Sequence, residues 1–318
     1  MRVLLVAGGW SPEREISLKG AAIIREALSR NGHEVIFYDL NDGFEGLLSA
    51  ARHADKAFLN LHGAPGEDGL VQAMLDSAGC PYQGGDPASS FLALHKSASS
   101  EVFRNAGLKT PRGVFLPVMP DESWRPPFGF PVFVKPDTGG SSLGMSRVTD
   151  CGHLFDALRR CGGKDMRVEE LISGAELTCA VLEIPKSFRL APAADFSECT
   201  AEDHGPFIRV AMPPVLIVPR GEYFDFADKY DADGAREICP APIDRDTRLR
   251  VQDAALAAHE ALRLKDYSRA DFIVPDDGAP VILEVNTLPG MTSTSLVPKE
   301  AAAMGISYAA LLEILLSS

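Results

Sequence analysis

The chain has 318 residues, of which 46% are hydrophobic and 24% charged, and its formal net charge is −13 at pH 7. This length and composition are typical of a globular protein with more than one domain. The acidic surplus argues against nucleic acid as a partner, because a phosphate backbone requires excess lysine and arginine. No apolar run is long enough to predict a membrane span. The scattered cysteines, without any C-x-x-C pair, predict buried free thiols of a cytoplasmic protein and neither disulfides nor a zinc site.

The first sixty residues predict alternating strands and helices. Short apolar runs predict strands at residues 2–7, 34–38 and 56–60. Ser17 is a candidate cap for a helix that runs to about Arg30. This alternation predicts a parallel sheet with helices on its faces. The loops 8–15 and 61–68 would then lie at the carboxyl edge of the sheet, where open α/β folds bind ligands.

The pattern changes in the second part of the chain. Helices are predicted over 88–106, and a proline-rich stretch at 117–131 marks a joint. A small α+β unit is predicted from a strand, a loop, a helix and a strand at 130–135, 138–144, 151–160 and 166–171. Later elements are a β-rich region from 176, a polar loop at 221–236 and helices at 246–264 and 308–315. We therefore expect an N-terminal α/β parallel-sheet domain at 1–92, followed by two α+β subdomains at 93–174 and 175–318.

Two oxygen-bearing side chains lie at the end of the apolar run VILEVN, residues 281–286. Glu284 and Asn286 are two apart on a predicted strand, so they point to the same face. Asp271, on a neighbouring predicted strand, can add a third oxygen. Three hard oxygens suit Mg²⁺ better than zinc or iron, and magnesium held in this way usually carries nucleotide phosphate. A solvated strand edge is the competing interpretation, although Arg269 beside Asp271 would make a buried cluster costly without a ligand.

Two further segments fit nucleotide binding. Lys135 ends a predicted strand and precedes the loop PDTGGSSLGMS, whose backbone N–H groups can approach phosphate oxygens. The loop matches neither common phosphate motif, and a flexible hairpin fits it equally well. Glu169 and Glu176 flank apolar residues that fit the walls of an adenine site, or else a charged edge strand.

Two N-terminal segments are open to a structural and a functional interpretation. His62, in LHGAPGEDG, follows a predicted buried strand and fits either a structural hydrogen bond or a catalytic site. Glu13 and Glu15 lie in a first helical turn, where carboxylates normally interact with the helix dipole.

Six segments occur in a fixed order: GGWSPEREISL, LHGAPGEDG, KPDTGGSSLGMS, FDFADKY, SRADF and LEVNTLPGMTSTSLVP. Together they resemble the D-alanine–D-alanine ligases of the ATP-grasp superfamily, and the resemblance runs from the first strand to Pro298. It implies an ATP-grasp fold whose two α+β subdomains sandwich ATP. It also implies ATP-dependent ligation of two D-alanines through a D-alanyl phosphate, for peptidoglycan precursor synthesis, in a cytoplasmic homodimer that binds neither nucleic acid nor membrane.

The resemblance also implies roles for individual residues. At the first D-alanine, Glu15 binds the ammonium group, Ser141 and Tyr230 fix this glutamate, and His62 lies nearby. The ATP contacts are Lys96, Lys135 and Lys229 at the phosphates, Glu169 at the adenine and Glu176 at the ribose. The metal ligands are Asp271, Glu284 and Asn286, for two Mg²⁺ ions that Mn²⁺ can replace. The remaining groups are Arg269 and the Gly290 N–H in an oxyanion hole, and Ser295 and Leu296 at the carboxylate of the second D-alanine.

The polar loop 221–236, which carries Lys229 and Tyr230, is expected to act as a lid, because an acyl-phosphate must be kept from water. Three positions depart from the family pattern and leave the ATP affinity open. His95 replaces an acid, Asp266 a small residue and Leu171 an aromatic residue.

Three alternatives compete with this interpretation. The first is a D-alanine–D-lactate or other D-alanine–D-X ligase, and Tyr230 speaks against the lactate enzyme because those relatives commonly have phenylalanine there. The second is an ATP-grasp ligase for another acid, which EREISL and LHGAPGEDG disfavour. The third is a non-catalytic nucleotide-binding regulator, which would be expected to lack a magnesium ligand or Arg269.

Overall fold

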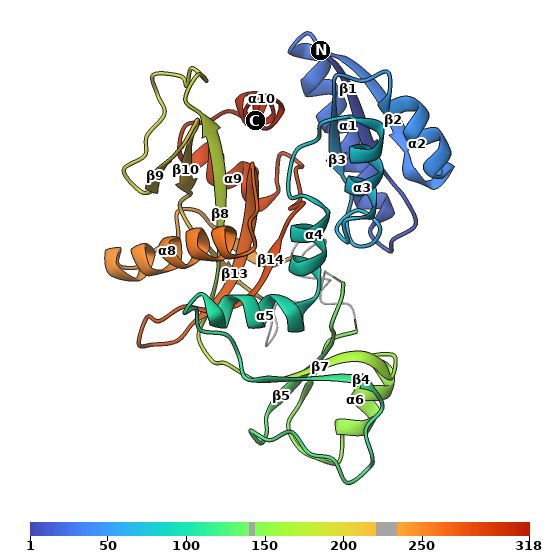
Figure 1. The fold of residues 1–318 in the computed structure, drawn as a ribbon. Coiled ribbons are helices and arrows are strands. Elements are labelled where there is room, and N and C mark those ends of the chain that lie inside the picture. Colours follow the sequence, from blue (N-terminus) through green and yellow to red (C-terminus); the bar gives the residue numbers. More distant parts are fainter. Residues whose placement is uncertain (140–143, 221–233) are drawn as a thin grey trace.

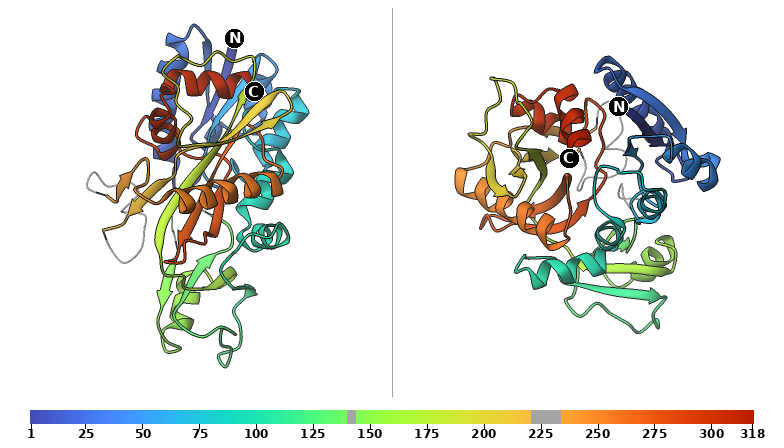
Figure 2. Two further views of the ribbon diagram at one scale, coloured as in Figure 1. Left: turned by 90° about the vertical axis from the view of Figure 1, so that its left-hand side faces the viewer. Right: turned by 45° about the horizontal axis from the view of Figure 1, so that its top comes forward.

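A computed structural model describes residues 1–139, 144–220 and 234–318. Within these residues the strands form a three-stranded, a four-stranded and a seven-stranded sheet (Figure 1). Ser141, Lys229 and Tyr230, with most of the predicted lid, lie outside the described residues. The two chain termini lie at one end of the molecule and the four-stranded sheet at the other, as the left view of Figure 2 shows.

The N-terminal sheet is parallel, which confirms the prediction from the strand–helix alternation. Its strands are ordered β2-β1-β3. They are β1 (Arg2–Ala7), β2 (Glu34–Asp39) and β3 (Lys56–Asn60). The connecting elements are α1 (Arg14–Arg30), the 3-10 helix η1 (Leu40–Asp42), α2 (Phe44–Ala51) and α3 (Leu70–Ala78). β3 is an edge strand, yet all of its residues are buried. Phe58 of β3 packs in the same cluster as residues of β8 (Ala175–Pro185) and α10 (Tyr308–Ser317).

Ser17 does not cap α1 as predicted, because the helix begins three residues earlier, at Arg14. Ser17 is buried and connects the ends of two strands instead. Its hydroxyl accepts a hydrogen bond from the Gly8 N–H at 2.8 Å and donates one to the Asn60 carbonyl. The Asn60 amide in turn donates to the Ser17 carbonyl at 2.7 Å. This network fixes the start of α1 over the carboxyl edge of the sheet.

The middle of the chain forms the antiparallel four-stranded sheet, ordered β4-β7-β5-β6, after two helices. The helices are α4 (Pro87–Leu94) and α5 (Lys96–Asn105). The strands are β4 (Gly113–Val118), β5 (Val132–Pro136), β6 (Ser146–Val148) and β7 (Lys164–Glu170). β4 was not predicted, and only one of its six residues is buried. The sheet is covered by α6 (Leu154–Arg160), which begins three residues later than predicted.

The seven-stranded sheet is built around β8 (Ala175–Pro185), which pairs with β10 (Phe207–Ala211), β11 (Val215–Val218) and β13 (Tyr267–Val274). The outer strands are β9 (Thr200–His204), β12 (Arg236–Ile238) and β14 (Val281–Asn286). The helices are α8 (Arg245–Ala261), α9 (Leu296–Ala303) and α10 (Tyr308–Ser317).

The alternation of β8 divides the core between the two faces of its sheet. Leu177, Cys179 and Val181 pack in one cluster with residues of α8. Ala180 and Leu182 pack in another cluster with residues of α10 and of the N-terminal domain. The N-terminal domain therefore packs against one face of β8, and α8 packs against the other face.

Two further expectations concern cysteines and membrane spans. The prediction that the cysteines are buried is confirmed for Cys80 and Cys179 and is wrong for Cys151, which is exposed. The other three are only partly buried: Cys161, Cys199 and Cys239. In the part of the chain that the structure describes, no single helix is long and apolar enough to cross a membrane. α9 and α10 meet the length and composition test only as a pair, which is bent by 104°.

The hydrogen bonds of Ser17 generate a stability prediction. Ser17→Ala leaves the buried Gly8 N–H without its acceptor, so the free energy of unfolding should fall by about 1–3 kcal/mol in urea denaturation. Ser29→Ala, at an exposed position of the same helix, is the matched control. Equal stabilities for the two variants would show that Ser17 does not hold the edge of the sheet together.

Candidate active site

A cavity of about 710 Å³ lies between the four-stranded and the seven-stranded sheets. Its volume is typical of a small-molecule site, which spans roughly 300–1,000 Å³. Its apolar lining includes Leu171, Ile172, Ile217, Ile273 and Leu283, and its polar lining includes Lys96, Lys135, Glu169, Glu176, Asp271 and Glu284. The predicted nucleotide contacts on the described residues therefore share one cavity.

The three predicted metal ligands meet where β13 and β14 pair. Asp271 lies opposite Glu284 and Arg269 opposite Asn286 in the antiparallel register. The Asn286 amide donates to Asp271 Oδ2 at 3.0 Å, and the Thr178 hydroxyl donates to Asp271 Oδ1 at 2.6 Å. This cluster holds two carboxylates and one amide, and among the described residues no group of three His, Cys, Asp or Glu side chains could hold a metal. Its all-oxygen donor set fits a hard cation such as Mg²⁺.

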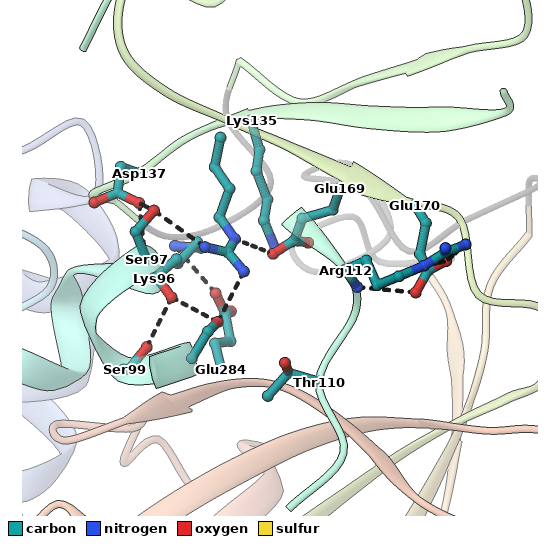
Figure 3. Close-up of polar contacts among 12 residues, drawn as sticks. Lys96, Ser97, Ser99, Thr110, Arg112, Lys135, Asp137, Glu169, Glu170 and Glu284 are labelled. Carbon is teal, nitrogen blue, oxygen red and sulfur yellow. Dashed lines mark hydrogen bonds and ion pairs between the residues drawn. The ribbon is translucent and has the colours of Figure 1, made fainter. Parts of the chain in front are cut away.

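Basic side chains neutralise both carboxylates of this cluster. Arg269 donates to Asp271 Oδ1 and Oδ2 at 2.9 and 2.8 Å. Burial alone would lower the pKa of Arg269, but Asp271 and Glu284 outweigh it and hold the pKa above the ordinary value. Lys96 Nζ lies 3.1 Å from Glu284 Oε2 (Figure 3). It also donates to the Gly139 carbonyl at 2.6 Å.

A second pair of opposite charges also lines the cavity. Lys135 Nζ lies 2.6 Å from Glu169 Oε2, and Arg167 donates to Glu169 Oε1. Burial would raise the pKa of Glu169, but the charges of Lys135 and Arg167 outweigh it and lower the pKa. Arg167 was not predicted as a site residue. Its signal was the alternation of β7, which places the residues at 167 and 169 on one face.

His62 and Glu13 come together at the carboxyl edge of the N-terminal sheet. Glu13 is 8% exposed, whereas Glu15 is exposed to solvent, so the structure does not bring Glu15 to His62. Residues two apart at the start of a helix differ in direction by about 200°, so Glu13 and Glu15 face opposite sides. Burial lowers the pKa of His62, Glu13 opposes this effect, and Arg269 adds to it. Arg269 therefore links this group to the metal-ligand cluster.

Glu67 was not predicted as a site residue, although it lies in the same loop as His62. Its carboxylate accepts hydrogen bonds from the Gly63 N–H at 2.7 Å and the Leu288 N–H at 3.4 Å. Burial raises the pKa of Glu67 to about 7, and the charges of Glu13 and Glu284 add to the rise. Strongly shifted pKa values such as that of Glu67 are frequent at functional sites.

Gly290 and Ser295 lie at the start of α9. Ser295 is the N-cap residue and Leu296 the first residue of the helix. The Ser295 hydroxyl accepts a hydrogen bond from the Thr292 N–H at 3.1 Å. A Cβ at Gly290 would lie only 3.0 Å from Ser295 Oγ, so glycine keeps this turn open. The N-terminus of a helix favours a carboxylate, because its backbone N–H groups are free.

The three departures from the family pattern have clear positions. Leu171 lines the cavity. His95 stacks on Phe91, with ring centroids 4.0 Å apart. Asp266 is buried with φ 63°, and its Oδ2 accepts a hydrogen bond from the Gly84 N–H at 2.8 Å. That hydrogen bond ties the start of β13 to the N-terminal half of the chain.

Comparisons with known proteins agree over almost the whole chain. A family model described as D-ala D-ala ligase C-terminus matches residues 121–317. The D-alanine–D-alanine ligase of Desulfovibrio desulfuricans is 49% identical over 319 residues, covering 99% of this chain and 96% of its own. The enzyme of the same name from Nitratidesulfovibrio vulgaris is 50% identical over 317 residues, with coverages of 98% and 96%. The crystal structure of D-alanine–D-alanine ligase from Bacillus anthracis complexed with ATP has a TM-score of 0.80 at 31% identity, covering 100% of this chain and 96% of its own.

The pKa of Glu67 generates a pH prediction. Because its pKa of about 7 in the folded chain lies above the unfolded value, the stability that Glu67 contributes is complete below the unfolded pKa, about 4.3, and is lost as the pH rises through 7. Glu67→Gln should therefore gain stability relative to the parent as the pH rises from about 4 to 7, measured by urea denaturation. A difference that stays constant over this range would contradict the raised pKa.

Proposed function

This chain belongs to the D-alanine–D-alanine ligase family, and we propose that the residues described above carry the family's reaction. The reaction is the ATP-dependent ligation of two D-alanines to D-alanyl-D-alanine, a step of peptidoglycan synthesis. The observation that supports the site most directly is the meeting of Lys96 and Arg269 with the carboxylates of Asp271 and Glu284 at one end of a 710 Å³ cavity. ATP and D-alanine both bring carboxylate or phosphate charge that such a site can hold.

ATP is proposed to lie along the cavity between the two sheets. Leu171 and Ile172 would pack on the adenine, Glu169 would accept a hydrogen bond from its amino group, and Glu176 would hold the ribose. Lys96 and Lys135 would contact the phosphates, and Lys229, outside the described residues, is proposed to join them. The lining supports this assignment because it combines apolar residues such as Leu171 with basic residues such as Lys96 and Lys135.

Asp271, Glu284 and Asn286 are proposed to hold two Mg²⁺ ions, which Mn²⁺ can replace. When bound, the cations offset the negative charge that gathers on the phosphates, which is the main electrostatic task of phosphoryl transfer. Arg269 and Lys96, which pair with these carboxylates in the described chain, would then be released toward the reacting groups.

The first D-alanine is proposed to bind beside His62, with its ammonium group on Glu13. Glu13 is chosen over Glu15 because it is buried beside His62, while Glu15 is exposed. Ser141 and Tyr230, outside the described residues, are proposed to fix this glutamate. The D-alanine carboxylate oxygen attacks the γ-phosphorus of ATP, the bond to ADP breaks, and D-alanyl phosphate forms.

The second D-alanine is proposed to bind with its carboxylate at the N-terminus of α9, on Ser295 and Leu296. Its neutral amine attacks the carbonyl carbon of D-alanyl phosphate, and phosphate leaves as the amide bond forms. Arg269 and the Gly290 N–H would stabilise the oxyanion of that step, where one donor is typically worth about 10²–10³ in rate.

Three coarser features complete the proposal. The domains are proposed to divide at residues 92 and 174, so that ATP lies between the second and third. The protein is proposed to act in the cytoplasm, where ATP is available, and as a homodimer. Sedimentation velocity at several protein concentrations measures the oligomeric state directly, and a monomer at every concentration would remove the homodimer from the proposal.

The reaction is tested by product analysis. With Mg-ATP and D-alanine, the protein should release one phosphate for each D-alanyl-D-alanine detected by mass spectrometry. Parallel reactions with L-alanine, D-serine and D-lactate as partners of D-alanine define the acceptor. Folded protein that releases no D-alanine-dependent phosphate, or that makes only a mixed product, would contradict the dipeptide ligase.

The metal cluster is tested by Glu284→Gln. The neutral amide keeps the shape of the side chain but removes one charge beside the phosphates, so kcat should fall at least about 10²-fold with the thermal unfolding midpoint nearly unchanged. Glu237→Gln, on β12 and outside the cavity lining, is the control. A kcat near that of the parent at saturating magnesium would mean that Glu284 has a structural role only.

A further inference from the structure

Arg167 is a buried cation that the proposed reaction does not use. It is among the largest fully buried side chains, 2% exposed, and it lies on β7 two residues before Glu169. Its guanidinium donates to Glu169 Oε1, to Ser97 Oγ at 3.1 Å and to Ser100 Oγ at 3.0 Å. All three acceptors are protein groups, and Arg167 is not among the residues that line the cavity.

The hydroxyls that hold Arg167 belong to the helix that carries Lys96. The Ser97 hydroxyl and N–H both donate to Asp137 Oδ1, and the Lys96 N–H donates to the Asp137 carbonyl at 3.0 Å. Figure 3 shows Lys96, Lys135, Glu169 and Asp137 around this junction. Arg167 therefore joins Glu169, the carboxylate proposed to meet the adenine, to the helix that carries Lys96.

The backbone also makes room for this guanidinium. Gly113 is the first residue of β4, and a Cβ at this position would lie 2.8 Å from Arg167 Nη2 and 2.9 Å from its Cζ. A contact under 3.0 Å is too short for a real Cβ, so a side chain at 113 would displace the guanidinium. Glycine and arginine thus form a matched pair on neighbouring strands.

The charge of Glu169 depends on both of its cationic partners. In the described chain Lys135 and Arg167 each bind one of its oxygens. If Lys135 turns to the phosphates of ATP, as proposed above, Arg167 remains as the only one of the two that still offsets the buried carboxylate. An uncompensated buried charge is strongly unfavourable, so Glu169 would then move or take up a proton.

We propose that Arg167 is a positioning residue that holds Glu169 as a fixed carboxylate and thereby makes the enzyme select adenine over guanine nucleotides. This inference rests on the proposed role of Glu169 at the adenine. A carboxylate accepts a hydrogen bond from the 6-amino group of adenine and repels the 6-carbonyl oxygen of guanine. A protonated or displaced Glu169 loses this discrimination, because a carboxylic acid can donate to the guanine carbonyl.

The test compares Arg167→Met with the parent enzyme and with Arg104→Met, an exposed arginine on α5. Arg167→Met should raise the KM for ATP roughly tenfold and lower the ATP-over-GTP preference in kcat/KM by a similar factor. The kcat at saturating ATP and the KM for D-alanine should stay within about twofold, since neither the metal cluster nor the D-alanine site contacts Arg167. Arg104→Met should match the parent in every constant.

Two further variants distinguish positioning from packing. Arg167→Lys keeps the charge and should recover part of the ATP preference, whereas a purely structural role gives no such rescue. Gly113→Ala leaves Arg167 in place but pushes its guanidinium, so it should lower the ATP preference in the same direction by a smaller factor. If Arg167→Met does not fold, Gly113→Ala and Arg167→Lys decide the question. An ATP preference within twofold of the parent in the folded variants overturns the proposal.

Direct binding separates this inference from the proposed reaction. The affinities of parent and variants for the non-hydrolysable analogues AMPPNP and GMPPNP, measured by calorimetry with magnesium, require no ligase activity. A parent that makes no dipeptide but prefers AMPPNP, with the preference lost in Arg167→Met, refutes the ligase and keeps the role of Arg167. If the parent makes dipeptide but the variants keep the full AMPPNP preference, the ligase function stands and the role of Arg167 is refuted.

Discussion

Pairing of opposite charges at the walls of the cavity is the constraint on which the candidate site depends. Four cations, Lys96, Lys135, Arg167 and Arg269, lie against three carboxylates, Glu284, Glu169 and Asp271. Each carboxylate would be costly to bury alone, and each cation would be costly without it. These charges are therefore held in ion pairs, and under the proposed function phosphate and metal would take the place of the protein partners when the ligands bind.

The sheets position these pairs because they share strands and cores. β8 packs on α8 with one face and on α10 with the other, while its edge pairs with β13, which carries Arg269 and Asp271. The N-terminal domain shares the α10 core, and Asp266 ties it to the start of β13. Arg269 and the N-terminal domain, with the metal and D-alanine sites proposed for them, are thus held by one continuous core. The four-stranded sheet, with a core of its own, carries the proposed adenine contact Glu169.

The sequence predicted the parallel N-terminal sheet and the cluster of Asp271, Glu284 and Asn286. Both depend on local patterns: the alternation of strands and helices along the chain, and the alternation of side chains along a strand. Glu284 and Asn286 share a strand face in any register, and Asp271 needed only a neighbouring strand. The choice between Glu13 and Glu15 could not be made in this way, since it depends on which side of α1 meets the sheet. Arg167 was missed for a related reason. A charged residue on a short strand is normally solvated. Arg167 is buried with the help of acceptors that lie about seventy positions away in the sequence, the Ser97 and Ser100 hydroxyls.

The close fit between Gly113 and Arg167 restricts how this sequence can change. Any side chain at position 113 collides with the guanidinium, whereas loss of the arginine leaves space beside a glycine that no longer needs to be one. A substitution at position 113 therefore acts on Glu169 through the guanidinium of Arg167, although Gly113 is not among the residues that line the cavity.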